Sequence, residues 1–119
     1  MDALIEKIRG IVGETGILLG EDAAARSDTW PPTGDCKAKA IIRPSTTDEV
    51  SAVLKLCHQD GQSVVTHGGV TGLAGGALTS ADDIVISLER MRRLEPVDAI
   101  DRTLLVEAGA PLQLSLIHI

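Results

Sequence analysis

A nine-residue stretch, residues 68–76, reads GGVTGLAGG and holds five of the chain's 12 glycines. It directly follows residues 63–67, a Val- and Thr-containing run that reads as a β-strand. Each ordered glycine costs about 0.5–1 kcal/mol of extra chain entropy relative to alanine. We therefore expect this stretch to need positive φ angles or the close approach of a ligand to its backbone. Successive exposed amides in such a turn form an anion-binding concavity.

The charge pattern supports an anion site made of backbone groups. Residues 61–81 contain no Asp, Glu, Lys or Arg, although these residues make up 24% of the chain. An anion would be held by main-chain amides, each charge-assisted hydrogen bond contributing about 1.5–3 kcal/mol, and Thr71 could add a hydroxyl. The stretch lacks the lysine of a P-loop and the spacing of a dinucleotide fingerprint. The alternative, a glycine-rich surface loop without a ligand, stays open.

Composition bounds the classes of function. A chain of 119 residues is one domain or part of one, and its core is aliphatic, with one Trp and no Phe or Tyr. The net charge of −6 argues against a nucleic-acid partner. Cys36 and Cys57 match no metal or redox spacing and fit idle thiols in a reducing compartment. With no signal-like start and no apolar run suited to a bilayer, we expect a cytoplasmic protein without a membrane span.

The periodicity of the chain predicts an α/β arrangement. Residues 39–44 read as a strand, Thr46 and Glu49 open a helix with a capping box, and the strand of residues 63–67 follows. This βαβ unit implies parallel strands, and the glycine stretch leaves the second strand at its carboxyl end, where α/β proteins bind ligands. The other expected segments are a helix (2–12), an irregular stretch (20–38) in which only residues 23–26 could form a helical turn, two strands (83–88 and 102–109) and a solvated charged turn (89–93).

Two single residues have alternative interpretations. Trp30 is expected to cover an edge of the core, with a role over a ligand as the alternative. His67, at the entrance to the glycine stretch, could bind a ligand or carry a proton, or it could hold the strand end. No nucleophile–base set and no metal site can be assembled from the sequence.

Several motifs, taken in order, resemble one known family. They are IRP (42–44), TDEV (47–50), VVTHGGVTGLAGGA (64–77), ISLERM (86–91) and VEAG (106–109). This order resembles the FAD-linked oxidase N-terminal domain of the vanillyl-alcohol oxidase and p-cresol methylhydroxylase superfamily. Within it, the chain is most similar to D-lactate, glycolate and D-2-hydroxyglutarate dehydrogenases. The likeness covers residues 37–113, and a weaker one extends to residues 28–30.

The resemblance implies a flavoprotein that oxidises a 2-hydroxy acid and passes a hydride to the flavin. The implied fold is α/β (α+β overall), a βαβ unit with a short parallel sheet that forms the first subdomain of a PCMH-type FAD-binding domain. Relatives that bond FAD covalently often have His where this chain has Val70, so non-covalent FAD is implied. The implied cofactor-binding residues are Pro44, His67, Gly68, Gly69, Val70, Thr71, Gly72, Leu73, Gly75, Gly76 and Ala77.

The same resemblance divides the chain and limits its activity. We expect an N-terminal helix and lead-in (1–36), a partial FAD-binding domain (37–113) and an atypical tail (114–119) that is an artefact. The second subdomain and the cap domain, which carries the substrate site and catalytic base, are expected to be missing. The isolated chain should therefore bind FAD weakly or not at all and have no catalytic or metal-binding residue. A non-catalytic nucleotide- or flavin-binding module, or an interaction domain that binds no ligand, remains the alternative.

Overall fold

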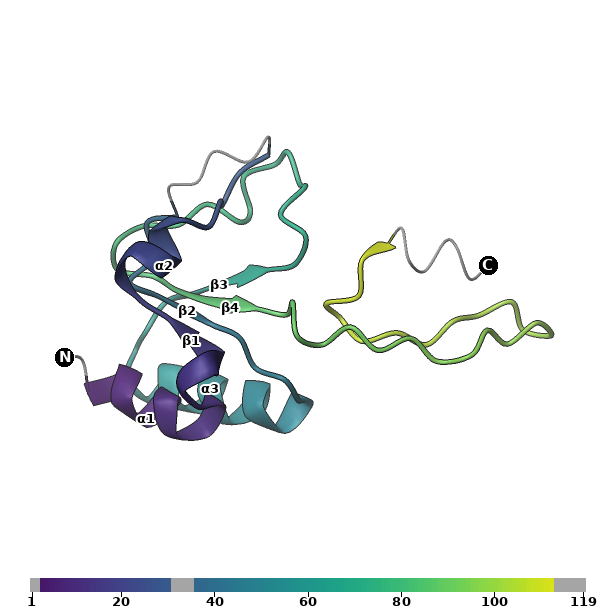
Figure 1. Ribbon diagram of the computed structural model, residues 1–119, viewed down its shortest axis with the longest axis horizontal. Coiled ribbons are helices and arrows are strands. Elements are labelled where there is room, and N and C mark those ends of the chain that lie inside the picture. Colours follow the sequence, from purple (N-terminus) through teal and green to yellow (C-terminus); the bar gives the residue numbers. More distant parts are fainter. Residues whose placement is uncertain (1–2, 31–35, 113–119) are drawn as a thin grey trace.

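The computed structural model describes residues 3–30 and 36–112 (Figure 1). The proposed tail, residues 114–119, lies outside these residues. The helices are α1 (Ala3–Val12), α2 (Gly20–Ala24) and α3 (Thr47–Gln59), with a short 3-10 turn, η1 (Glu14–Gly16). The strands are β1 (Ile17–Leu18), β2 (Ala40–Ile42), β3 (Val64–His67) and β4 (Ile84–Ser87).

In the described residues the strands form one sheet in the order β1-β2-β4-β3. Strands β2, β4 and β3 are parallel, whereas β1 pairs antiparallel with β2 at the edge. The expected α/β class with a short parallel sheet is confirmed. Strand β4 lies between the two strands of the βαβ unit, so the glycine stretch connects neighbouring strands, β3 and β4.

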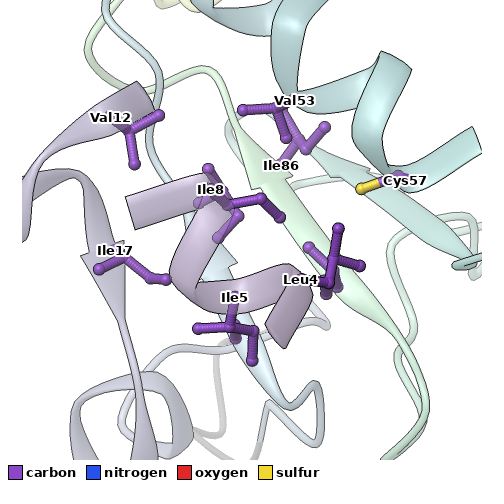
Figure 2. Packing of buried hydrophobic residues seen from close by; sticks show 11 residues of the cluster. Leu4, Ile5, Ile8, Val12, Ile17, Val53, Cys57 and Ile86 are labelled. Carbon is purple, nitrogen blue, oxygen red and sulfur yellow. The ribbon is translucent and has the colours of Figure 1, made fainter. Parts of the chain in front are cut away.

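Residues that alternate along the strands separate the core into two faces. One face packs against α1 and α3, and side chains from these helices and β4 meet there (Figure 2). The opposite face packs against α2 through Ile41, Val85 and Ala23, together with Cys36 and Ala38. Because strand side chains alternate, His67 and Ser87 lie on the same α2 face as Val65 and Val85.

Helix α3 begins at the expected cap. The Thr46 side chain accepts a hydrogen bond from the Glu49 amide at 3.1 Å. The Glu49 carboxylate, however, accepts from the amide and hydroxyl of Ser45 rather than from the Thr46 amide. In the expected capping box, the reciprocal hydrogen bond from the backbone to Glu49 is therefore donated by Ser45, one residue earlier than expected. At the other end, Gly61 has a φ of 67° and ends the helix as expected.

Two expectations for secondary structure are wrong. In residues 20–38 a helical turn is expected only at residues 23–26, but the helix, α2, begins at Gly20, and the short strand β1 precedes it. Residues 102–109 form no strand. They run back along residues 94–98 as an arm that leaves the body of the molecule, joined by isolated antiparallel bridges at Leu94–Val106 and Asp98–Thr103 (Figure 1). With Ile100 and Leu105 exposed, the described part of the chain supplies no apolar sheet face against which the arm could pack.

Candidate functional site

The glycine loop, residues 68–76, leaves the carboxyl end of β3 and returns toward β4 on the side of α2 (Figure 1). Among the described residues, no acceptor takes a hydrogen bond from any amide nitrogen of residues 68–77. Buried amides are nearly always paired, but these lie on exposed or half-exposed residues and stay free to donate. The loop therefore presents a continuous set of available backbone donors.

Two residues of the loop adopt backbone conformations with positive φ. Gly75 has a φ of 83°, as expected for a glycine in this stretch, and Val70 has a φ of 55°. A β-branched residue with positive φ is a genuine outlier, and such strain costs about 1–3 kcal/mol. Positive φ angles are expected in this stretch, and one of the two residues that adopt them, Val70, is not a glycine. Four other glycines, Gly68, Gly69, Gly72 and Gly76, lie open, with no atom within 4 Å of an added Cβ.

Two polar side chains hold the base of the loop. The Nε2 atom of His67, which is buried, lies 2.8 Å from the Ala77 carbonyl oxygen, so the imidazole closes the loop. The Asp28 carboxylate accepts hydrogen bonds from the Thr79 amide at 2.9 Å and the Thr79 hydroxyl at 2.7 Å. The loop is thus fixed at its exit while its amides remain free.

The charge of Asp28 is stabilised in this position. Burial alone raises the pKa of this carboxyl, but hydrogen bonds from the Thr79 side chain and amide outweigh that effect, and the net pKa lies below its ordinary value. The carboxylate is therefore ionised at neutral pH although Asp28 is only 7% exposed. Hydrogen bonds to an ionised carboxylate are stronger than neutral ones, so opening the contact between Asp28 and Thr79 is energetically unfavourable.

A hollow of about 280 Å³ lies between the loop and residues 26–30, which we call the lead-in segment. Residues of this lead-in hollow include Trp30, His67, Gly68, Gly69 and Val70. Its rim carries an ion pair in which Arg26 donates to both carboxylate oxygens of Glu89, at 2.9 and 3.1 Å. Glu89 was expected to lie in a solvated turn, and instead it ties β4's end to the lead-in segment.

Two further hollows border the loop. The loop-tip hollow, of about 450 Å³, lies against residues 72–78 and again includes Trp30. The arm hollow, of about 460 Å³, lies on another side, between Gly68, Gly69 and Thr71 of the loop and residues 108–112, where the arm ends. The free amides are therefore flanked by open space on more than one side.

The structure brings most of the expected site residues together. Residues 67–77 all line one or more of the three hollows. Pro44 is buried two residues after the end of β2 and lines none of these three hollows. The sequence analysis did not identify Arg26, Asp28 and Glu89. Each of them pairs with a residue that is distant in the sequence. The weak likeness at residues 28–30 was the available signal for the lead-in segment.

The described residues contain no group of three or more His, Cys, Asp or Glu side chains placed to hold a metal ion. Nor does any helix in that part of the chain have the length and apolar character required to cross a bilayer. Cys36 and Cys57 are buried free thiols, and burial raises the pKa of the Cys57 thiol. The donors beside the loop are therefore its backbone amides and the Thr71 hydroxyl, with one cationic side chain, that of Arg92, on the wall of the arm hollow.

This arrangement fits a diphosphate that joins two ring systems. Backbone donors at a turn bind phosphate oxygens without any cationic side chain. Space on either side of the donors leaves room for groups attached to each phosphate. An open loop of glycines permits the close approach of a phosphate to the main chain.

Comparison with known proteins agrees with this geometry. Residues 38–114 match the family described as "FAD binding domain". The D-2-hydroxyglutarate dehydrogenase of Xanthomonas citri pv. viticola is 43% identical over 74 residues, covering 62% of this chain and 16% of that protein. The D-lactate dehydrogenase of Archaeoglobus fulgidus is 40% identical over 93 residues, covering 76% of this chain and 21% of that protein. The chain thus spans about a fifth of the length of these relatives.

The fold agrees with solved structures. The structure of p-cresol methylhydroxylase with substrate bound superposes with a TM-score of 0.77 at 20% identity, covering 98% of this chain and 24% of that one. An alkyldihydroxyacetonephosphate synthase superposes equally well, with a TM-score of 0.77 at 15% identity, covering 96% of this chain and 24% of that one. The expected PCMH-type fold is confirmed. On the match of residues 38–114, the chain belongs to the FAD binding domain family, and its cofactor is FAD.

Proposed function

We propose that this chain is the N-terminal FAD-binding part of an oxidoreductase that oxidises a 2-hydroxy acid of the D-lactate, glycolate or D-2-hydroxyglutarate type. The observation that carries the proposal is the set of unpaired amides of residues 68–77, held open at a loop whose base is clamped. The names of the relatives, D-2-hydroxyglutarate dehydrogenase and D-lactate dehydrogenase, support the substrate class.

The residues of the chain have binding roles in this proposal. The amides of residues 68–76 and the Thr71 hydroxyl hold the diphosphate, with His67, Leu73 and Ala77 completing the wall of the site. Pro44 lies toward the adenine side, as the family resemblance implies. Bound FAD supplies the acceptor for the hydride that leaves the α-carbon of the hydroxy acid. Val70 offers no nucleophile for a covalent link, so we propose that FAD is bound non-covalently.

The division of the chain follows the same reasoning. We propose an N-terminal region (1–36), which includes the lead-in segment, a partial FAD-binding domain (37–113) and a tail (114–119) that is not part of the domain. The substrate site and catalytic base are assigned to the parts of the relatives that this chain does not cover. The two free thiols suit a reducing compartment, and we propose the cytoplasm, although some relatives, such as that of fission yeast, are named as mitochondrial.

Gly72 offers a direct test of the diphosphate site. A Cβ at this position meets no atom within 4 Å, so a side chain can be added without disturbing the fold. Gly72→Glu places a carboxylate beside the bound phosphates, and Gly72→Gln adds the same volume without charge. We expect Gly72→Glu to weaken FAD binding at least tenfold, or about 1.4 kcal/mol, and Gly72→Gln to weaken it less.

Binding is measured by equilibrium dialysis and by broadening of the phosphorus NMR signals of FAD at millimolar ligand, which suits a weak complex. Equal affinity in both variants and the unchanged chain would contradict the assignment of the loop. The second candidate, a non-catalytic flavin-binding module, predicts the same result in this assay. The coding DNA beyond codon 119 distinguishes the two candidates. The oxidoreductase requires an in-frame substrate domain there, and the non-catalytic module does not.

A further inference from the structure

The lead-in segment, residues 26–30, lies outside residues 38–114, which match the FAD binding domain family. It nevertheless forms a wall of the candidate site. Trp30 borders both the lead-in hollow and the loop-tip hollow, and most residues of the glycine loop line one or the other of them. The glycine loop and the segment after α2 lie at the same side of the sheet (Figure 1).

The exposure of Trp30 decides between its two interpretations. The side chain is 51% exposed and belongs to neither core cluster, so the expectation that it covers an edge of the core is wrong. Around the loop-tip hollow, Trp30 is joined by two further exposed apolar side chains, Leu73 and Leu78, and an exposed apolar patch of this kind marks a binding site. The chain has no Phe or Tyr, so Trp30 is its single aromatic surface.

The lead-in segment is anchored at two residues that precede Trp30, Arg26 and Asp28. Asp28, two residues before Trp30, accepts two hydrogen bonds from Thr79 at the loop exit. Arg26 is paired with Glu89 at the end of β4. The backbone between them is turned by Ser27, whose hydroxyl donates to the Thr29 carbonyl at 3.1 Å. Trp30 is therefore carried by a segment fixed to the loop and to the sheet.

We propose that Trp30 stacks on one of the two planar ring systems of the bound dinucleotide, and that the lead-in segment is the ring-binding wall of the site. The inference rests on the proposed function, because it needs the diphosphate at residues 68–77. The shared chemistry is a heteroaromatic ring joined to a phosphate, either adenine or isoalloxazine. An indole face stacks on any such ring, and this contact is worth about 1–3 kcal/mol when a base stacks on an aromatic side chain.

The test uses three ligands with the 119-residue chain. ADP carries adenine on a diphosphate, FMN carries isoalloxazine on a phosphate, and inorganic pyrophosphate has no ring. Affinities are measured by equilibrium dialysis for the unchanged chain, Trp30→Leu, Trp30→Phe and the control Ile100→Ala, a residue 93% exposed on the arm. Quenching of Trp30 fluorescence by ADP adds a contact readout, since ADP does not absorb where tryptophan emits.

We expect Trp30→Leu to weaken one ring ligand about 5- to 150-fold while leaving pyrophosphate unchanged, and Trp30→Phe to retain most of the affinity. Weakened ADP with quenched fluorescence assigns adenine to Trp30, and weakened FMN assigns isoalloxazine. Unchanged affinity for both ring ligands in Trp30→Leu would overturn the inference while leaving the loop assignment intact. If pyrophosphate binds Gly72→Glu as tightly as the unchanged chain, the loop assignment fails, and the proposed function and the inference fail with it.

Discussion

The clamp between Asp28 and Thr79 can be broken by one substitution with a calculable cost. One carboxylate oxygen of Asp28 accepts from both the amide and the hydroxyl of Thr79, at 2.9 and 2.7 Å. Hydrogen bonds to a charged group contribute about 1.5–3 kcal/mol each. Because the two bonds share one acceptor, we expect Asp28→Ala to lower the free energy of unfolding by about 3 kcal/mol.

The measurement is urea unfolding of the unchanged chain, Asp28→Ala and the control Asp82→Ala. With an m-value of about 1–2 kcal/mol per molar urea, a loss of ~3 kcal/mol lowers the midpoint by about 1.5–3 M. Asp82 is exposed and its carboxylate makes no hydrogen bond within the described residues, so its removal should change stability by less than about 0.5 kcal/mol. Equal midpoints for the two variants would refute the clamp.

The pH dependence gives a second readout of the same pair. The net pKa of Asp28 is lowered in the folded chain, because the bonds from Thr79 outweigh burial. A lowered folded pKa contributes stability above the unfolded value, about 3.9, and this contribution is lost as the pH falls through the folded pKa. The difference between the unchanged chain and Asp28→Ala should therefore be full at pH 7 and shrink below about pH 4. A difference that persists unchanged at lower pH would show that the charge of Asp28 is not the cause.

Two further predictions concern the frame around the site. Thr46→Ala removes the side-chain cap of α3 and should cost about 1 kcal/mol, seen as a melting temperature lower by about 4 °C, whereas Thr47→Ala, exposed in the first turn, should cost clearly less. Gly109→Ala should destabilise the attachment of the arm by about 1–3 kcal/mol, since the new methyl would clash with the backbone of Leu88. Hydrogen exchange would show this as faster exchange of the Gly109 amide, which donates to Met91 at 2.9 Å; unchanged exchange would contradict it.

Much of the sheet-and-helix frame was predictable from local pattern. The apolar spacing of α1, the Thr46 cap and the Gly61 stop of α3, and the β-branched runs of β2, β3 and β4 each follow from interactions within a few residues. The glycine loop was also predictable. Ordering five glycines in nine residues costs conformational entropy, which indicates that the loop has a structural or binding role.

Long-range contacts decided the remainder. Strand β1 consists of two residues and exists because it pairs with β2, a partner more than 20 residues away. Residues 102–109 have a strand-like composition, yet no neighbouring strand accepts them in the described chain, so they form the exposed arm. Their fate depends on what they pack against, which composition does not encode.

The sequence by itself determined the donors of the site, because an uncharged glycine-rich turn after a strand can offer an anion little besides its backbone. Only the tertiary structure decided how those donors are held and what stands beside them. Asp28 meets Thr79 across 51 residues and Arg26 meets Glu89 across 63, and these contacts set Trp30 beside the loop. Such pairings form when the sheet brings segments that are distant in the sequence to one edge. The local periodicity of the sequence does not predict them.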